Sequence, residues 1–388
     1  MSSRNLHYIV HPALGGLDTT KAPALLEANQ LVTAENIEYF TSGSRRKRPG
    51  TSRYNSSTIA AATTVTSLGD FWRYGTSTTP TQKFVATAGT QIYKDDGDGV
   101  WDSIKTGWGA NTSNVSFMLG GGYVVWFNGV DAAQKWNQTT VSDLTAAADT
   151  YSGGIYHQRR GWYWPVASNP STVRYSAASD ITDVTGGDTG NLVFDEDDGD
   201  KVIGISTTWR GDIFVFKGPQ FGSVHHLTGT TPSTYARERL FSGAPCVAHQ
   251  GIITSPNDIF WASRYGFHSL LATDKFGDVE EAFISRPVQR IFNELNRDRL
   301  PFSRGFYHPT RNLVGWAVPE GGQQENTVLF AYNFLLGLWA VWRFTGFIIA
   351  AIMTGLDPGG AGAGSPRLYI GGYDGFVREG DKTALTDD

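Results

Sequence analysis

Short apolar runs, each bounded by glycine, aspartate or asparagine, recur along most of this chain. Seven segments share one order: a strand-like run, a turn, an aromatic-rich run, a second turn and a third run. The aromatic-rich runs read QIYK, YVVWFN, GWYWPV, DIFVFK, DIFWAS, LVGWAV and RLYIGG. Their spacing, about 30–50 residues, is typical of β-propeller blades and comparable β-repeats.

A small antiparallel sheet cannot cover its own faces and leaves its edges open. Stacking several such sheets about an axis buries the aromatic faces between neighbours and leaves only short edges. The pattern therefore predicts an all-β chain: a β-propeller of about six to seven irregular blades, with an extended N-terminal arm and one short amphipathic helix. A pair of β-sandwiches is the alternative fold.

The repeat divides the chain into three parts. We expect residues 1–55 to form an N-terminal arm that contacts a neighbouring subunit, residues 56–380 the propeller, and residues 381–388 a flexible polar tail. Within the arm, a short helix is expected over residues 33–37. The amphipathic helix is expected over residues 286–299, with an apolar face formed by Val288, Ile291, Phe292 and Leu295.

Residues 334–353, FLLGLWAVWRFTGFIIAAIM, are apolar over a length that could cross a bilayer. Gly337 and Gly346 interrupt this stretch, and Arg343 would lie at mid-span, where a charge is costly. We therefore interpret it as short strands that are buried on both faces, and we expect no membrane span.

The composition limits the function. Only 18% of the residues are charged and the net charge is −5, whereas a general nucleic-acid binder normally carries a basic surplus. This does not exclude a protein that DNA merely passes. Cys246 is the single cysteine, so no internal disulfide framework is expected. The first residues lack a basic region followed by a long apolar core, so no secretory signal is expected.

Two acidic segments suggest metal binding at first sight. The run Asp195, Glu196, Asp197, Asp198 and Asp200 has carboxylates at the spacing of a calcium loop, but Gly199 stands where a third ligand is needed. We favour a turn that enters the next strand. The segment DDGDGVW, residues 95–101, resembles the Asp-box turn of sialidase-type propellers with its tryptophan one position too late, so a hairpin turn is expected.

The sequence favours a protein without catalysis. No two carboxylates are paired as a glycosidase requires, and the phosphate-loop, serine-hydrolase and zinc-protease motifs are absent. His225 and His226 are adjacent, so on a strand they point to opposite faces and cannot share a metal. We expect no enzymatic activity, no metal and no cofactor.

A basic cluster, Arg45, Arg46, Lys47 and Arg48, precedes Pro-Gly. It could be a nuclear signal or a phosphate-binding patch. Because the chain is acidic overall, we favour an exposed strand end that pairs with an acidic neighbour.

Several motifs, taken in order, resemble a known family. The opening GGLDTTKAPALLEANQLVTAENIEYFTSGSRRKRPG is similar to the N-terminal signature of virion-associated tail proteins of tailed bacteriophages. The segments DDGDKVIGISTTWRGDIFVFKGPQFGSVHHLTG, VLFAYNFLLGLWAVWRF and LYIGGYDGFVRE resemble three blades of the same family. The resemblance runs from about residue 14 to residue 380, and the best-known members are the propeller-containing nozzle (DNA-stabilisation) proteins of short-tailed phages.

This resemblance implies a structural virion protein: a homo-oligomeric ring, usually of six subunits, below the portal and adaptor and near tail fibre or spike proteins. Such a ring retains packaged DNA, provides the ejection channel and assembles in the bacterial cytoplasm. The basic cluster would then be an inter-subunit contact and the acidic run a lumen surface that repels DNA. The alternatives are a tail-tip propeller that binds host glycans and a glycan-cleaving propeller. Trp162 and Trp164 could stack on sugars in the first of these, but strand alternation puts both on one face and we favour a buried core for them.

Overall fold

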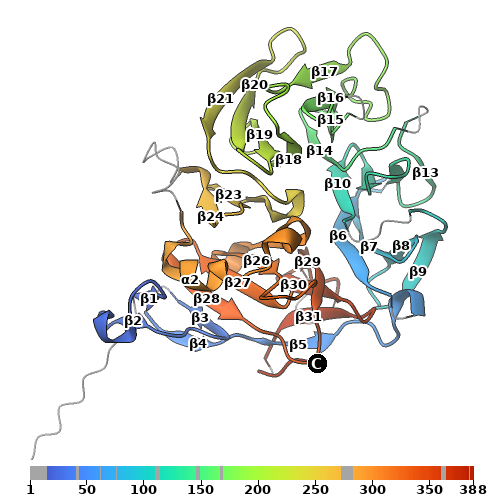
Figure 1. Ribbon diagram of the computed structural model, residues 1–388. Coiled ribbons are helices and arrows are strands. Elements are labelled where there is room, and N and C mark those ends of the chain that lie inside the picture. Colours follow the sequence, from blue (N-terminus) through green and yellow to red (C-terminus); the bar gives the residue numbers. More distant parts are fainter. Residues whose placement is uncertain are drawn as a thin grey trace, which may run out of the picture.

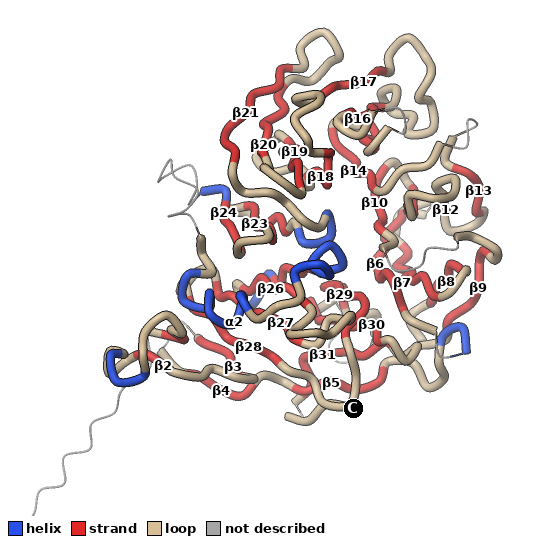
Figure 2. Tube along the Cα trace, in the orientation of Figure 1, coloured by secondary structure: helices blue, strands red, loops and turns tan. Residues whose placement is uncertain are grey.

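Each aromatic-rich run forms a central strand of its own antiparallel sheet in the computed structural model of the chain (Figure 1). Seven such sheets surround an axis as the blades of a β-propeller, so the predicted fold class is confirmed. Figure 2 shows that strands and loops account for almost all of the drawn structure. The structure describes residues 15–40, 43–61, 63–75, 77–109, 114–145, 149–166, 169–271, 283–359, 364–383 and 385–388.

The first four blades follow one another along the chain, each running from the innermost to the outermost strand. Blade 1 contains β6 (Val65–Arg73), β7 (Thr81–Ala88), β8 (Gln91–Asp95) and β9 (Trp101–Lys105). Blade 2 contains β10 (Ser116–Gly120), β11 (Tyr123–Phe127), β12 (Gln134–Trp136) and β13 (Val141–Asp143). Blade 3 contains β14 (Gly153–His157), β15 (Arg160–Trp164), β16 (Thr172–Tyr175) and β17 (Gly190–Val193). Blade 4 contains β18 (Lys201–Ile205), β19 (Ile213–Gly218), β20 (Ser223–Thr228) and β21 (Ala236–Ser242).

The remaining three blades are less regular. Blade 5 contains β22 (Ile253–Thr254), β23 (Ile259–Ala262) and β24 (Phe267–Ser269). Blade 6 contains β25 (Arg304–His308), β26 (Leu313–Val318), β27 (Val328–Asn333) and β28 (Leu338–Trp342). Blade 7 contains β29 (Ile349–Leu356), β30 (Pro366–Gly372), β31 (Val377–Lys382) and, from the other end of the chain, β5 (Gly50–Arg53).

The ring closes because β5 supplies the outer strand of the last blade. Arg53 lies opposite Arg378 and Ser52 opposite Glu379 in this antiparallel pair. The pairing covers an edge that β31 would otherwise leave open. It also corrects the predicted boundary between arm and propeller, since residues 50–53 belong to the propeller.

The rest of the described arm, residues 15–40 and 43–49, packs against blade 6 of its own chain (Figure 1). It contains the parallel pair β1 (Gly16–Leu17) and β2 (Gln30–Leu31) and the antiparallel hairpin β3 (Ile37–Tyr39) and β4 (Arg45–Lys47). Leu17 and Tyr39 are buried in the same core as Leu338 and Trp342. The described part of the arm therefore packs on its own chain. The sequence had predicted that this segment contacts a neighbouring subunit.

The expected helix over residues 33–37 is wrong, because Glu35 forms an isolated parallel bridge with Val341 of β28 and Ile37 begins the strand β3. The N–H of Val341 donates to the carbonyl of Ala34, and the N–H of Asn36 donates to the carbonyl of Val341, both at 2.9 Å. These bonds cover the outer edge of blade 6, which would otherwise be exposed.

The amphipathic helix forms in a shorter version than predicted. The α-helix α2 (Gln289–Asn293) lies between the 3-10 turns Arg286–Val288 and Arg297–Phe302. Its predicted apolar face is confirmed for Val288, Phe292 and Leu295, which are all buried in the core shared with blade 6.

Aromatic side chains fill the space between neighbouring sheets, as at the contact of blades 5 and 6. The ring of Phe267 stacks on Trp316, with centroids 4.3 Å apart, and Trp316 lies 6.0 Å from Trp339. The apolar stretch at residues 334–353 contributes β28 and the start of β29 to this core, as short buried strands. Within the described part of the chain, no helix has the length and hydrophobicity needed to cross a membrane.

Candidate functional site at the arm–blade junction

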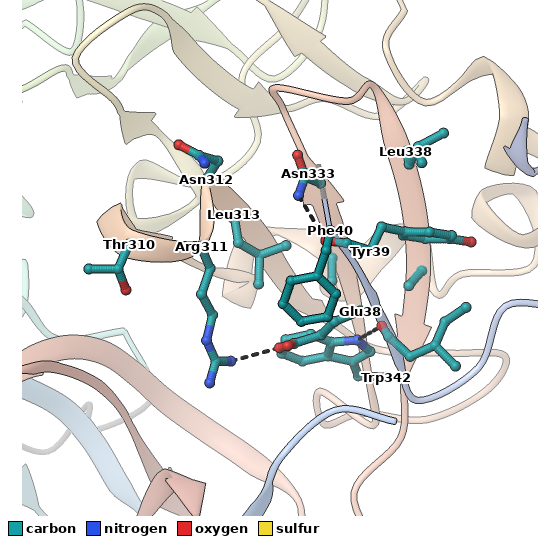
Figure 3. Close-up of a pocket in the computed structure, with 13 residues that line it drawn as sticks. Glu38, Tyr39, Phe40, Thr310, Arg311, Asn312, Leu313, Asn333, Leu338 and Trp342 are labelled. Atoms are coloured by element: carbon teal, nitrogen blue, oxygen red, sulfur yellow. Dashed lines mark hydrogen bonds and ion pairs between the residues drawn. The ribbon is translucent and has the colours of Figure 1, made fainter. Parts of the chain in front are cut away.

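The hairpin of β3 and β4 covers a small cavity of about 150 Å³ at the edge of blade 6 (Figure 3). Its apolar lining comes from Ile37, Tyr39, Leu313, Leu338 and Trp342, among others. The arm is pinned above it by side-chain to backbone hydrogen bonds. The indole N–H of Trp342 donates to the carbonyl of Ile37 at 2.9 Å, and the amide of Asn333 donates to the carbonyl of Tyr39 at 3.4 Å.

A chain of charges runs along one wall of this cavity. Glu38, which is buried, lies 2.7 Å from Arg311 and 3.5 Å from Arg46. Burial raises the pKa of the Glu38 carboxyl, although both guanidinium groups oppose that shift. Arg311 also contacts Asp381, and Nε2 of His308 lies 3.2 Å from Asp381.

This network joins three parts of the fold, because Glu38 is in the arm, Arg311 lies between β25 and β26, and Asp381 is in β31. Burial acts to raise the pKa of Asp381, but the hydrogen bond from His308 and the charge of Arg311 leave it below its usual value. Sequence reasoning missed these residues. Glu38 and Arg311 are 273 positions apart, so no local pattern indicates that they meet.

The four residues of the basic cluster divide into two classes. Arg45, Arg46 and Lys47 form β4 and are exposed. Arg48 is buried and forms an ion pair with Asp387 at 2.6 Å. It also donates to the carbonyl of Arg343 and lies over the ring of Phe344 at 4.1 Å. The predicted inter-subunit role is therefore wrong for Arg48, whose charge holds the arm to its own chain.

The same ion pair fixes the position of the C-terminal tail. The carboxylate of Asp387 is only 6% exposed and accepts two hydrogen bonds from Arg48. It also accepts the backbone N–H of Thr345 at 3.1 Å. Residues 381–388 were predicted to form a flexible tail. Instead, residues 381 and 382 end β31, and Asp387 holds the end of the chain at the base of the arm.

The acidic run lies between blades 3 and 4, remote in the fold from the basic cluster (Figure 1). Asp198 forms an ion pair at 2.6 Å with Lys217, whose side chain is fully buried. Asp200 accepts the backbone N–H groups of Gln220, Phe221 and Gly222 at 2.7, 3.0 and 2.6 Å. Asp198 and Asp200 therefore stabilise turns, and the predicted lumen role does not fit them.

Asp195, Glu196 and Asp197 are the exposed members of the run. Asp195 pairs with Arg239 at 3.2 Å, and the side chain of Asn169 donates to Glu196. Asp95 in the other acidic segment is buried in a hairpin turn, where it accepts the N–H groups of Gly97 and Gly99 at 3.1 and 2.9 Å.

One constellation resembles a hydrolase triad but has the wrong geometry. Ser223 Oγ lies 2.9 Å from Nε2 of His225, and Asp195 lies 3.5 Å from the same nitrogen. A triad needs the serine and the carboxylate on opposite ring nitrogens. Burial also lowers the pKa of His225. Among the described residues, no three His, Cys, Asp or Glu side chains are grouped to hold a metal ion.

The two tryptophans considered for sugar stacking lie in the core. Trp162 and Trp164 have no exposed surface, and the indole N–H of Trp164 donates to the carbonyl of Ile203 at 3.0 Å. A sugar cannot reach either ring. The expectation that these two residues belong to the core is therefore confirmed, and the sugar-stacking alternative is excluded for them.

Solved structures resemble this chain in fold. No protein-family model matches it, and no curated protein matches it either. Among solved structures, the WD40 β-propeller domain of Doa1 is 8% identical, with a TM-score of 0.50 over 86% of this chain and 98% of that one. A streptogramin B lyase is 10% identical, with the same TM-score and coverage. Both support the propeller architecture, and identities this low carry no function with them.

Proposed function

We propose that this chain is a non-catalytic structural subunit of a bacteriophage tail, where copies of it form a ring that retains packaged DNA and serves as the channel for its ejection. The resemblance of successive sequence motifs to tail nozzle proteins motivates the phage setting. The seven-bladed propeller is compatible with it, since a propeller offers broad, rigid side surfaces for assembly.

One observation carries the proposal: β4 is an exposed basic strand on an arm that is firmly anchored. Arg45 and Lys47 have no carboxylate within 4.0 Å among the described residues, whereas Arg48 next to them is fully engaged. A contact surface that must order a neighbouring subunit works best when it is rigid before binding. The anchored hairpin supplies such a surface at the outer rim of blade 6.

The neighbours of the ring and the passage of DNA through it follow from the proposed position in a phage tail. The ring would contact the portal or adaptor on one side and fibre or spike proteins on the other, and DNA would pass without specific binding. The net charge of −5 supports free passage, because a carboxylate-rich channel wall does not hold phosphates. Glu196 and Asp197, which are exposed, are the members of the acidic run available for such a wall.

Native mass spectrometry combined with negative-stain electron microscopy tests the proposal. We expect a closed ring of identical subunits with a central opening. A protein that stays monomeric at every concentration would contradict it. A polysaccharide-degradation assay checks the catalytic part of the proposal, and glycan turnover by the purified chain would overturn that part.

A further inference from the structure

Charge is unevenly distributed along the chain and therefore around the propeller. Residues 89–200, which include the two outer strands of blade 1 and all of blades 2 and 3, contain 15 Asp and Glu but only six Lys and Arg. Residues 1–88 contain nine Lys and Arg but only five Asp and Glu. One part of the rim is thus strongly acidic, and the N-terminal part is basic.

Carboxylates without an ion pair mark the rim of blades 2 and 3, although Asp143 accepts a hydrogen bond from the Gln134 amide and Asp180 accepts two from Thr182. Asp143 at the end of β13 and Asp180 after β16 are exposed, and neither has a Lys or Arg within 4.0 Å among the described residues. Lys135 is close enough to interact with both, which places the two carboxylates in one patch. Its ammonium group donates to the carbonyl of Leu144, and burial lowers its pKa.

The basic strand and this acidic patch lie at opposite sides of the molecule. In a ring of seven blades, the positions across the axis from blade 6 are blades 2 and 3. Figure 1 shows β4 at the lower left and β13 at the right, with the propeller between them. The two surfaces are thus too far apart to neutralise each other within one chain.

We propose that the exposed face of β4 docks on the acidic rim of blades 2 and 3 of a second copy of this chain. Arg45 and Lys47 would pair with carboxylates such as Asp143 and Asp180, so that charges without an ion pair in the described part of the single chain gain one. Because the two surfaces differ and lie on opposite sides, the contact is head-to-tail, the type that closes into a ring when the rotation between copies allows it. This inference rests on the proposed function and identifies the subunit contact behind it.

Two charge reversals test the contact. The variant Arg45→Glu/Lys47→Glu and the variant Asp143→Lys/Asp180→Lys should each lose the assembly seen for the unaltered chain by native mass spectrometry. Mixing the two variants should restore it, since the acidic arm of one then faces the basic rim of the other. The control Lys201→Glu/Arg290→Glu alters the net charge as much as the first variant, at exposed sites away from both surfaces, and should assemble normally.

The outcomes separate this inference from the proposed function. If the unaltered chain forms a ring and both charge-reversal variants still form it, the proposed contact between β4 and the acidic rim is wrong. The proposed role as a structural ring subunit is then unaffected. If the unaltered chain never assembles, the proposed function fails as well. If the single reversals abolish assembly but the mixture does not recover it, the head-to-tail pairing is wrong. If Arg45 and Lys47 bind a duplex oligonucleotide and leave assembly unaffected, the partner is nucleic acid and the inference is overturned.

Discussion

At the scale of single residues, Lys217 shows how this fold uses its acidic run. The side chain is completely buried, yet its ammonium group donates to the carbonyls of Phe194 and Asp195 and to the carboxylate of Asp198, at 2.8, 2.6 and 2.6 Å. A buried charge is tolerated only when it is paired and hydrogen-bonded in this way. The turn between blades 3 and 4 is thus folded around the ammonium group of Lys217.

Replacing Asp198 by Asn should therefore destabilise the protein. The substitution leaves the buried ammonium without its carboxylate, and we expect the free energy of unfolding to fall by about 1–3 kcal/mol. Asp197→Asn is the matched control, because Asp197 is exposed and asparagine tolerates its positive φ of 61°. Denaturant unfolding of both variants checks the difference, and equal stability would contradict the role assigned to Asp198.

Part of this arrangement could be predicted from the sequence and part could not. The spacing of carboxylates around Gly199 indicates a turn and argues against a calcium loop, and the structure has a turn there. The buried partner of Asp198 was not predictable, because Lys217 lies on the next blade and looks like any strand-end lysine. The same holds for Arg48, which appears equivalent to its three basic neighbours until Asp387 is placed beside it.

At the scale of elements, the two ends of the chain hold each other. Arg48 at the base of the arm and Asp387 in the tail form a buried ion pair. Burial acts to raise the pKa of Asp387, but the hydrogen bonds and charge of Arg48 outweigh it and leave the pKa below the usual 3.8. An acid whose pKa is lowered by folding stabilises the protein above its unfolded-state pKa and loses that contribution as the pH falls through its folded-state pKa.

The variant Asp387→Asn should reveal this contribution as a function of pH. It should be less stable than the unaltered protein at pH 7, and the difference should shrink once the pH drops below about 3.8. Denaturant unfolding at a series of pH values measures it. Asp388→Asn serves as the control, since that carboxylate is 65% exposed and lies 3.7 Å from Arg53. A difference that persists unchanged at low pH would exclude the ion pair as its cause.

Removing residues 1–53 should weaken the propeller far more than its length suggests. The deletion takes away β5 and the buried side chains of Leu17 and Tyr39, and burial of one such side chain contributes roughly 1.5–3 kcal/mol. We expect a loss of at least about 3 kcal/mol or a broad, non-cooperative thermal transition. A deletion of residues 1–14 keeps all of these elements and should unfold much like the full chain.

The elements that could be predicted are those whose partners are close in sequence. Six of the seven aromatic-rich runs became second strands of their blades and QIYK a third strand, because each pairs with strands a few residues away. The strand β5 was missed, since its partner β31 lies more than 320 residues further along. The expected helix at residues 33–37 failed for the same reason: pairing with Val341 overrides its local preference.

At the scale of the whole molecule, the charge asymmetry should govern assembly. If the arm of one copy meets the acidic rim of the next, association should weaken as the Debye length falls from about 10 Å at 0.1 M salt to about 3 Å at 1 M. Mass photometry across this salt range measures the shift from ring to monomer. Association that strengthens with salt would instead indicate an apolar contact and contradict the charge-based surface.

The closure of blade 7 has a consequence for how this protein is made. The strand β5 leaves the ribosome before its partner β31, which emerges only after more than 300 further residues. The strands of the first six blades can pair with one another as they are synthesised, whereas β5 has no partner strand until β31 appears. The propeller of every nascent chain therefore stays open until β31 has been synthesised. A premature stop before β31 yields a product whose ring of blades cannot close.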